Sequence, residues 1–352
     1  MTMAAENLRR ALSLIGFAAL LGVSTSFASA AEWKRIGFEG EPINTLAIDP
    51  EATATIYAGT DKGLFKSTDG GSSWSAVLPT EPPLHKLYSV VINPADTKTL
   101  FALEYAFNGD GDAPDGLILR KSADAGATWE AVETDLRPGH FFNHMPNIAF
   151  EPKSSTLYLV GPELWASTNG GAHFERIADP GSPALTLLID PDDTNILYLS
   201  TDNSDVYKST DGGKTWTMLA AVEESPFTVS AVARHPTNPA ILYAATAYGM
   251  RKSSDGGMRW DVVDEGIEYG SYNYAASAVA IDPAHPDTIY AGAAGRLYRS
   301  DNAGKNWTDA GAGLSDFGWV KQLVFDPKNP TILYAGTVKG LWKLEGEATK
   351  AN

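Results

Sequence analysis

An eight-residue motif that recurs along the chain restricts its possible folds more than any other feature. The motif reads Ser-x-Asp-x-Gly-x-x-Trp, and four copies keep all four residues. Two weaker copies carry Asn in place of Asp, and one of these also carries Phe in place of Trp. Repetition at intervals of about 20–50 residues is typical of architectures in which each copy marks one structural unit. The copies span residues 67–74, 122–129, 167–174, 209–216, 253–260 and 300–307.

A second marker runs in phase with the motif and counts the units. It is an apolar segment that ends in an acid-proline or similar dipeptide, and successive copies lie 44, 58, 39, 45, 47 and 44 residues apart. Two further short apolar segments follow each copy, and in all but the last unit the motif and a fourth segment come next. The dipeptides begin at Asp49, Asn93, Glu151, Asp190, His235, Asp282 and Asp326.

Four short strands in every ~45 residues, with turn residues between them, are typical of a β-propeller blade. A single four-stranded sheet has two apolar faces that it cannot bury alone. Stacking such sheets around an axis buries both faces of each sheet and leaves only short edges exposed. The sequence therefore predicts an all-β fold, a seven-bladed β-propeller of four-stranded antiparallel blades.

The two ends of the chain predict how the ring closes. The last unit has three strands and stops after residues 340–343 without a motif, whereas residues 33–36 resemble the segment that follows the motif elsewhere. We therefore expect residues 32–38 to form the outer strand of the seventh blade, so that an N-terminal strand completes the C-terminal blade. The predicted organisation is a signal peptide at 1–30, a single propeller at 31–346 and a disordered tail at 347–352.

The first thirty residues have the features of a secretory signal. Arg9 and Arg10 precede an apolar run at 11–23, and a small-residue cleavage site lies at 28–30. We therefore expect a periplasmic or secreted protein with no membrane insertion after cleavage. The formal net charge of −16 argues against nucleic acid as a partner, because such binding depends on neutralising phosphates. The chain has no Cys to form disulfides, and we expect a monomer.

The motif resembles the Asp-box (BNR) repeat of sialidases, sortilin ectodomains, photosystem assembly factors and xyloglucan-cleaving glycosidases. The resemblance covers essentially the whole mature chain. The residue types fit a structural role, since Asp accepts backbone N–H groups in a turn, Gly permits positive φ and Trp packs on neighbouring blades. These families share the box and little chemistry, so the box does not identify a function. The predicted structural residues are Asp69, Trp74, Asp124, Trp129, Asp211, Trp216, Asp255, Trp260, Asn302 and Trp307.

One turn resembles the active site of the xyloglucan-cleaving enzymes. Those enzymes carry a catalytic Asp in a Tyr-Ala-x-Thr-Asp segment of the first blade, and residues 57–61 match it, so the resemblance implies that Asp61 is a base. Their catalytic acid comes from a second propeller domain, and this chain has one propeller. An inverting pair needs carboxyl groups ~6.5–9.5 Å apart, so Asp202, Asp205 or Asp112 would have to substitute. The alternative is that Asp61 is an ordinary turn residue.

Aromatic residues and histidines occur in the variable connections on the face opposite the boxes, where propellers carry functional loops. We expect them to line a pocket for a sugar ring or a peptide side chain, and the alternative is that they cap the blades. Two of the histidines, four residues apart, are also candidate zinc ligands without an evident third. The predicted ligand-binding residues are Tyr105, Phe107, His140, Phe142, His144, Tyr248, Tyr272, Tyr274 and Trp319.

An expanded acidic turn at residues 104–116 is a candidate Ca²⁺ site. Asp110, Asp112 and Asp115 supply the oxygen ligands that this hard cation prefers, and the alternative is a solvated acidic loop. No cofactor is otherwise expected. The sequence thus predicts an exported recognition module that binds a glycan, a peptide or a partner protein, with a glycoside hydrolase as the alternative.

Overall fold

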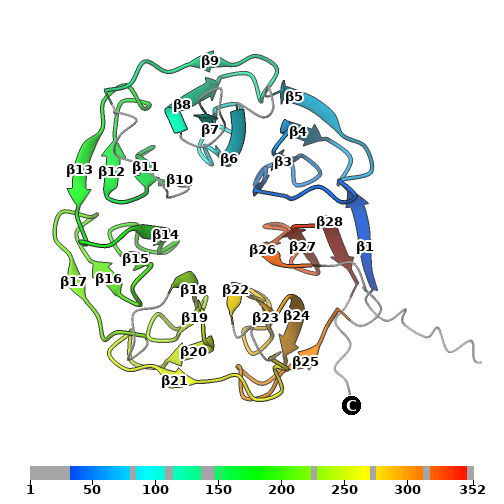
Figure 1. Ribbon diagram of the computed structural model, residues 1–352, viewed down its shortest axis with the longest axis vertical. Helices are drawn as coiled ribbons and strands as arrows, with labels where there is room; N and C mark the ends of the chain where they lie inside the picture. Colours follow the sequence, from blue (N-terminus) through cyan, green and yellow to red (C-terminus); the bar gives the residue numbers. More distant parts are fainter. Residues whose placement is uncertain are drawn as a thin grey trace, which may run out of the picture. The chain divides into compact units, whose positions relative to one another are not determined.

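The computed structural model describes residues 32–79, 85–107, 114–135, 147–151, 153–222, 228–269, 275–311 and 318–346, without the side chains of residues 85, 106, 107, 114 and 115. All of them belong to one compact unit, Ala31–Asn352. The predicted signal peptide and tail lie outside this described part. The strands form seven four-stranded antiparallel sheets, which Figure 1 shows as blades around a central opening. This architecture confirms the predicted fold.

In six blades the strands follow one another outward from the axis in chain order, and in the last blade the N-terminal strand is the outermost. Blade one comprises β2 (Thr45–Ile48), β3 (Ile56–Thr60), β4 (Gly63–Ser67) and β5 (Ser75–Pro79); blade two, β6 (His85–Ile92), β7 (Leu100–Phe107), β8 (Pro114–Ser122) and β9 (Glu130–Ala131); blade three, β10 (Asn147–Phe150), β11 (Leu157–Val160), β12 (Leu164–Ser167) and β13 (Glu175–Ala178); blade four, β14 (Ala184–Ile189), β15 (Leu197–Thr201), β16 (Val206–Ser209) and β17 (Thr217–Met218).

Blade five comprises β18 (Val229–Arg234), β19 (Leu242–Thr246), β20 (Gly249–Ser253) and β21 (Asp261–Val262); blade six, β22 (Ala276–Ile281), β23 (Ile289–Ala293), β24 (Arg296–Ser300) and β25 (Thr308–Asp309); blade seven, β26 (Val320–Phe325), β27 (Ile332–Thr337), β28 (Gly340–Glu345) and β1 (Glu32–Gly37). The fourth strands begin one residue after the Trp of the box, or after the Phe that replaces it, not at that residue, and β9, β17, β21 and β25 have only two residues. Short outer strands limit the unpaired edge of each sheet.

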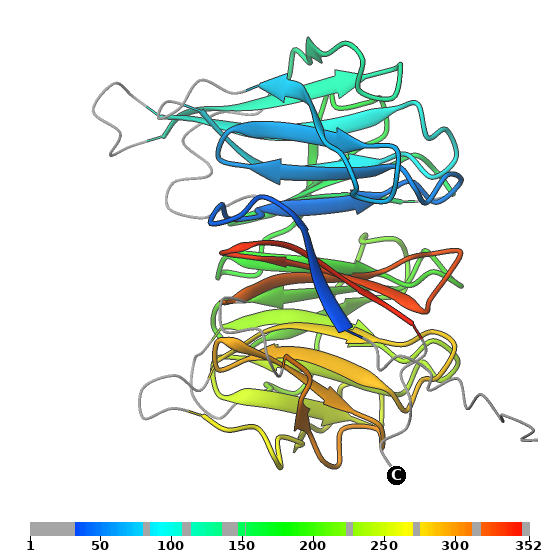
Figure 2. The ribbon, with the colours of Figure 1, turned by 90° about the vertical axis from the view of Figure 1, so that its right-hand side faces the viewer.

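The N-terminal strand closes the ring as predicted. β1 pairs antiparallel with β28, and Trp33 lies opposite Leu344 while Arg35 lies opposite Trp342. Figure 2 shows β1 (blue) beside β28 (red). The two tryptophans belong to one core cluster, and each is 7% exposed. Both ends of the described chain therefore contribute to blade seven.

The core consists of layers between successive blades. The second strand of six blades is buried at every position, in β3, β11, β15, β19, β23 and β27. Between blades one and two, for example, Tyr57 and Leu64 pack with Leu87 and Leu100. Gly59 allows this close approach, because a Cβ there would come within 2.6 Å of Leu87. The described residues form no helix long and apolar enough to cross a membrane.

Candidate functional site

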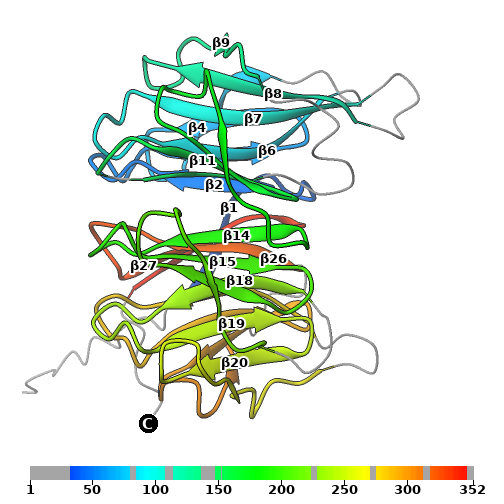
Figure 3. The same ribbon diagram turned by 90° about the vertical axis from the view of Figure 1, so that its left-hand side faces the viewer.

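The strands of every blade run between two faces, as the side view in Figure 3 shows. We call one the box face, because it carries the first-to-second turns and the Asp boxes between the third and fourth strands. We call the other the loop face, which carries the second-to-third turns and the connections between blades. Asp61 lies in a turn of the loop face between β3 and β4, whereas Asp69 lies on the box face between β4 and β5.

The carboxylates of the boxes are occupied by their own turns. Asp69 accepts hydrogen bonds from the Ser73 hydroxyl at 2.6 Å, the Ser73 N–H at 2.9 Å and the Ser67 hydroxyl at 2.8 Å. These bonds, those of Ser73 first, lower the pKa of Asp69 to about 2. The side chains of Asp124 and Asp211 make the same set of bonds with Thr128 and Thr215. The geometry suits turn stabilisation and leaves no acid poised for proton transfer.

Three of the box tryptophans, Trp74, Trp260 and Trp307, donate hydrogen bonds to the blade before their own. Trp74 donates its indole N–H to the carbonyl of Ile36 in β1 at 2.9 Å, and Trp307 donates to the carbonyl of Val263 at 2.7 Å. Trp307 is buried, whereas the other box tryptophans are half-buried. The half-buried tryptophans therefore contribute less burial free energy to folding than a fully buried indole would.

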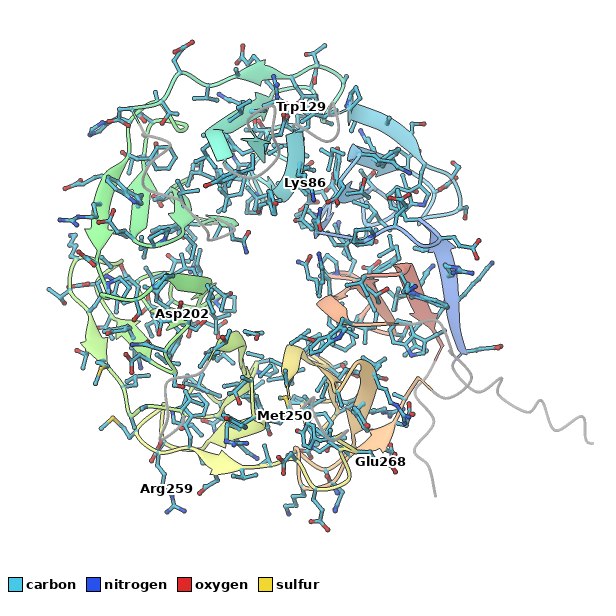
Figure 4. All side chains as sticks on the ribbon, in the orientation of Figure 1. Lys86, Trp129, Asp202, Met250, Arg259 and Glu268 are labelled. Carbon is cyan, nitrogen blue, oxygen red and sulfur yellow. The ribbon has the colours of Figure 1, made fainter. Side chains whose placement is uncertain are left out.

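A channel of about 680 Å³ runs along the axis and is lined by the first strands of all seven blades. Its volume lies within the range of about 300–1,000 Å³ that small-ligand sites occupy. Figure 4 looks along this axis and labels Lys86 at the edge of the opening. The channel is therefore a hollow of suitable size for a ligand on the axis.

Five polar residues from three blades meet at the loop-face end of the channel, and three of them, Asn44, Tyr88 and Lys321, line the channel itself. The Asn44 amide donates to Asp61 Oδ1 at 2.8 Å, and Lys86 Nζ lies 3.3 Å from Asp61 Oδ2. Lys321 Nζ, 277 positions from Asn44, donates to Asn44 Oδ1 at 2.8 Å. Tyr88 lies close enough for the charge of Asp61 to act on it. We call Asn44, Asp61, Lys86, Tyr88 and Lys321 the mouth cluster.

The electrostatics of the mouth cluster reflect partial burial of opposite charges. Burial lowers the pKa of Lys321, Asp61 opposes this change and Lys86 adds to it. Burial, followed by the charge of Asp61, raises the pKa of Tyr88. The cluster thus holds two ammonium groups and one carboxylate, in a chain whose formal net charge is −16. It offers donors and an acceptor side by side, with an excess of positive charge.

The two predicted catalytic acids lie in separate places. Asp61 belongs to the mouth cluster, and its side chain is 36% exposed. Asp202 lies in the turn after β15, where its N–H donates to the carbonyl of Pro183 at 3.0 Å. Figure 4 shows Asp202 and Lys86, the ion-pair partner of Asp61, on different sides of the opening. The described geometry therefore does not bring the two carboxylates into contact.

The predicted aromatic residues divide between the core and the surface. Tyr105 is buried and packs edge-on against Tyr88 at 5.9 Å, and burial raises the pKa of Tyr105 to about 12. Tyr248 and Trp319 are 41% and 37% exposed, and lie on the loop face of blades five and seven. Phe107 ends β7, with its side chain outside the described part. The residues His140, Phe142, His144, Tyr272 and Tyr274 also lie outside it.

The candidate Ca²⁺ site falls mostly outside the described residues. Asp110 and Asp112 are not described, and Asp115 lies in β8 without a described side chain. Within the part of the chain that is described, no group of three or more His, Cys, Asp or Glu side chains is arranged to hold a metal ion. Calcium binding by the acidic turn remains a prediction.

Sequence reasoning missed four members of the mouth cluster: Asn44, Lys86, Tyr88 and Lys321. All four lie just before or within the start of a first strand, where a blade begins beside the axis. A usable signal was present, because polar residues occur at these positions although the strands that follow are apolar. The repeat pattern does not indicate which of these side chains contact one another across blades.

Comparisons with known proteins agree with the fold. The BNR/Asp-box repeat model matches residues 207–218. A xyloglucanase of Hypocrea jecorina is 26% identical over 223 residues, which cover 56% of this chain and 26% of the enzyme. The structure of the GH74 xyloglucanase of Xanthomonas campestris superposes with a TM-score of 0.69 and 19% identity, covering 92% of this chain and 55% of the enzyme.

A second kind of propeller is about as similar in structure. YCF48 from Cyanidioschyzon merolae superposes with a TM-score of 0.67 and 14% identity, covering 90% of this chain and 99% of YCF48. At these identities the structural likeness concerns the fold alone. The chain spans about a quarter of the length of the xyloglucanases that it matches in sequence.

Proposed function

We propose that this Asp-box β-propeller is an exported recognition module that binds a glycan at the loop-face mouth of its central channel. The mouth cluster carries the proposal, because it gathers two ammonium groups, an amide, a carboxylate and a phenol from three blades around one opening. The sequence similarity to carbohydrate-active enzymes supports a glycan over other ligands. The signal-like N-terminus supports export.

The chemistry of the mouth cluster suits the recognition of sugar hydroxyl groups. A hydroxyl both donates and accepts hydrogen bonds, so it can donate to Asp61 while accepting from a lysine. The side chains of Lys86 and Asp61 are 38% and 36% exposed, which leaves both accessible to a ligand. Trp319 stands two residues before Lys321 in the chain and exposes an aromatic surface on which a sugar ring can pack.

A glycoside hydrolase is the second candidate, and the place of Asp61 favours it. The residue that matches the base of xyloglucan-cleaving enzymes lies at the channel mouth, where it accepts a hydrogen bond from Asn44 and pairs with Lys86. Hydrolysis also needs an acid ~6.5–9.5 Å away on the other side of the bond. Asp202, the other acid predicted from the sequence, lies on a different side of the opening from Lys86, the ion-pair partner of Asp61, so we rank binding above cleavage.

The two candidates are separated by measuring binding and cleavage on the same samples. Purified protein is titrated with xyloglucan, an acidic polysaccharide such as polygalacturonate and a neutral β-glucan, while released reducing sugar is followed. We expect saturable binding of at least one polysaccharide without sugar release. Lys86→Gln should weaken this binding about tenfold, equivalent to about 1.4 kcal/mol, because it removes a charged donor from the mouth.

Arg259→Gln is the matched control, since it removes an exposed cation from the box face and should leave binding unchanged. Sugar release that disappears in Asp61→Asn would place the hydrolase first. Failure of every polysaccharide to bind, with the protein folded, would reject a glycan as the ligand.

A further inference from the structure

Polar side chains encircle the loop-face end of the channel, with at least one from each blade. Blade seven supplies Lys321 and Gln322, and the other blades supply residues at the same or the adjacent register position of their first strands. Figure 1 shows these first strands, β2, β6, β10, β14, β18, β22 and β26, around the opening. We call the set the polar belt, and its members besides Lys321 and Gln322 are Thr45, Ser89, Asn147, Thr186, Ser230 and Ser277.

Hydrogen bonds between neighbouring blades hold parts of the polar belt in place. Gln322 Oε1 of blade seven accepts the N–H of Leu46 in blade one at 2.8 Å. Thr45 Oγ1 of blade one accepts the N–H of Val90 in blade two at 3.2 Å. A ligand therefore meets polar groups that are already ordered, which lowers the entropic cost of binding.

The channel wall becomes apolar beyond the polar belt, toward the box face. Ile48, Phe150 and Phe325 line it there, near the box-face ends of their strands. These side chains offer no hydrogen bonds to replace those that a charged or hydroxyl-rich group makes with water. The polar part of a ligand is therefore expected to stay at the belt.

Lys321 gives the polar belt a positive charge. It is the one charged residue among the described residues that line the channel, and its Nζ donates to the neutral oxygen of Asn44 at 2.8 Å. The carboxylate of Asp61 acts on Lys321 through its charge, but it also pairs with Lys86 at 3.3 Å. Burial lowers the pKa of Lys321, because the ammonium group has lost part of its hydration. An anionic ligand would compensate for that loss.

We propose that the ligand is an acidic glycan whose terminal uronic acid enters the channel and places its carboxylate on Lys321. This inference rests on the glycan site proposed above and names the class of sugar. The carboxylate accepts a charge-assisted hydrogen bond from Lys321 Nζ, and the ring hydroxyls bond the hydroxyl and amide groups of the polar belt. The first strands of all seven blades surround the channel, so a sugar chain enters it end first.

The role of the charge is tested with trigalacturonate and its methyl ester, which has the same sugar rings without the negative charges. Titration calorimetry with the full chain should show about tenfold tighter binding of the acid than of the ester. Lys321→Met should abolish this preference, because it removes the ammonium group and keeps an apolar stem of similar length. Equal binding of the acid and the ester by the wild type would contradict the inference and leave the glycan site in place.

Lys339→Met is the matched control. Lys339 is an exposed cation in the loop-face turn between β27 and β28 of the same blade, and it is not among the residues that line the channel. The variant should keep the preference for the acid. An equal loss of preference in Lys339→Met and Lys321→Met would assign the attraction to the whole face and overturn the proposal. Failure of xyloglucan, the neutral β-glucan and polygalacturonate alike to bind would instead reject the glycan site itself.

Entry of the chain end is tested with a short and a long fraction of polygalacturonate. We expect the amount of protein bound per polysaccharide chain to be the same for both fractions, because each chain offers its terminus only once. Sedimentation of the complexes at saturating protein measures this ratio. A ratio that rises in proportion to chain length would show that internal sugars bind, and would overturn the proposal.

Discussion

A histidine replaces the acid or amide at one of the seven first-to-second turns. Asp282 Oδ1 accepts the N–H groups of Ala284 at 2.8 Å and His285 at 3.1 Å. In blade five, His235 Nδ1 accepts those of Thr237 at 3.3 Å and Asn238 at 3.1 Å. An imidazole accepts at Nδ1 only while that nitrogen is unprotonated, so this turn depends on neutral His235.

The turn at His235 makes stability sensitive to mild acid. Burial lowers the pKa of His235 below its usual 6.5. The contribution is therefore complete above pH 6.5 and is lost as pH falls through the folded-state pKa. We expect His235→Asp to remove this loss, so that wild type but not variant loses about 1–3 °C of melting temperature between pH 7.5 and 5. Equal pH dependence of the two melting curves would contradict the assignment.

At the scale of one element, the box turn shows which substitutions it tolerates. Asn302 keeps the acceptor for the Asn306 N–H at 2.9 Å and donates its amide to Asn306 Oδ1 at 3.2 Å. Asp211 instead accepts from both the N–H and the hydroxyl of Thr215, at 2.9 and 2.6 Å. In these two boxes the residue four positions later matches the residue that it contacts, since Asn306 pairs with Asn302 and the Thr215 hydroxyl pairs with Asp211.

This rule predicts a compensating pair of substitutions. Asp211→Asn should destabilise the protein by about 1 kcal/mol. The amide NH₂ group that replaces one carboxylate oxygen cannot accept the hydrogen bond that the Thr215 hydroxyl donates in the wild type. Adding Thr215→Asn reproduces the pair of blade six and should recover part of the loss. Urea unfolding of the wild type, the single variant and the double variant gives the three free energies. A double variant no more stable than the single one would contradict the rule.

The position of a residue within its repeat unit could be predicted from the sequence, whereas contacts between residues of different units could not. The phase of the repeats was enough to place Trp33 in the blade of Trp342, because both lie at defined positions of one unit. The contact of Asn44 with Lys321 spans 277 positions and joins different units, so it depends on how blades rotate about the axis.

On the scale of the whole molecule, the ring is held by contacts between its two ends. Trp33 is 7% exposed in the cluster that joins blades six and seven. Trp74 of blade one donates a hydrogen bond to the carbonyl of Ile36, which lies in the same strand as Trp33. Opening this closure would expose the edge of β28 and the apolar faces of two blades. Stability should therefore depend strongly on a strand at the extreme N-terminus of the fold.

Trp33→Ala should lower the free energy of unfolding by about 3–5 kcal/mol, the usual loss for a buried aromatic side chain. Met258→Ala, at a side chain that is 67% exposed, should change it by less than about 0.5 kcal/mol. Urea unfolding of both variants supplies the comparison. A Trp33→Ala protein as stable as the Met258→Ala protein would show that β1 does not close the ring.

The central claim is that the loop-face mouth of the channel holds the ligand. Hydrogen–deuterium exchange with and without the tightest-binding polysaccharide tests it most directly, since it locates the bound segment without any substitution. We predict slower exchange at residues 44–46, 86–90 and 320–322, which surround the mouth cluster, and unchanged exchange in the boxes. Protection confined to boxes such as 67–74 or 253–260, with none at the mouth, would contradict the claim.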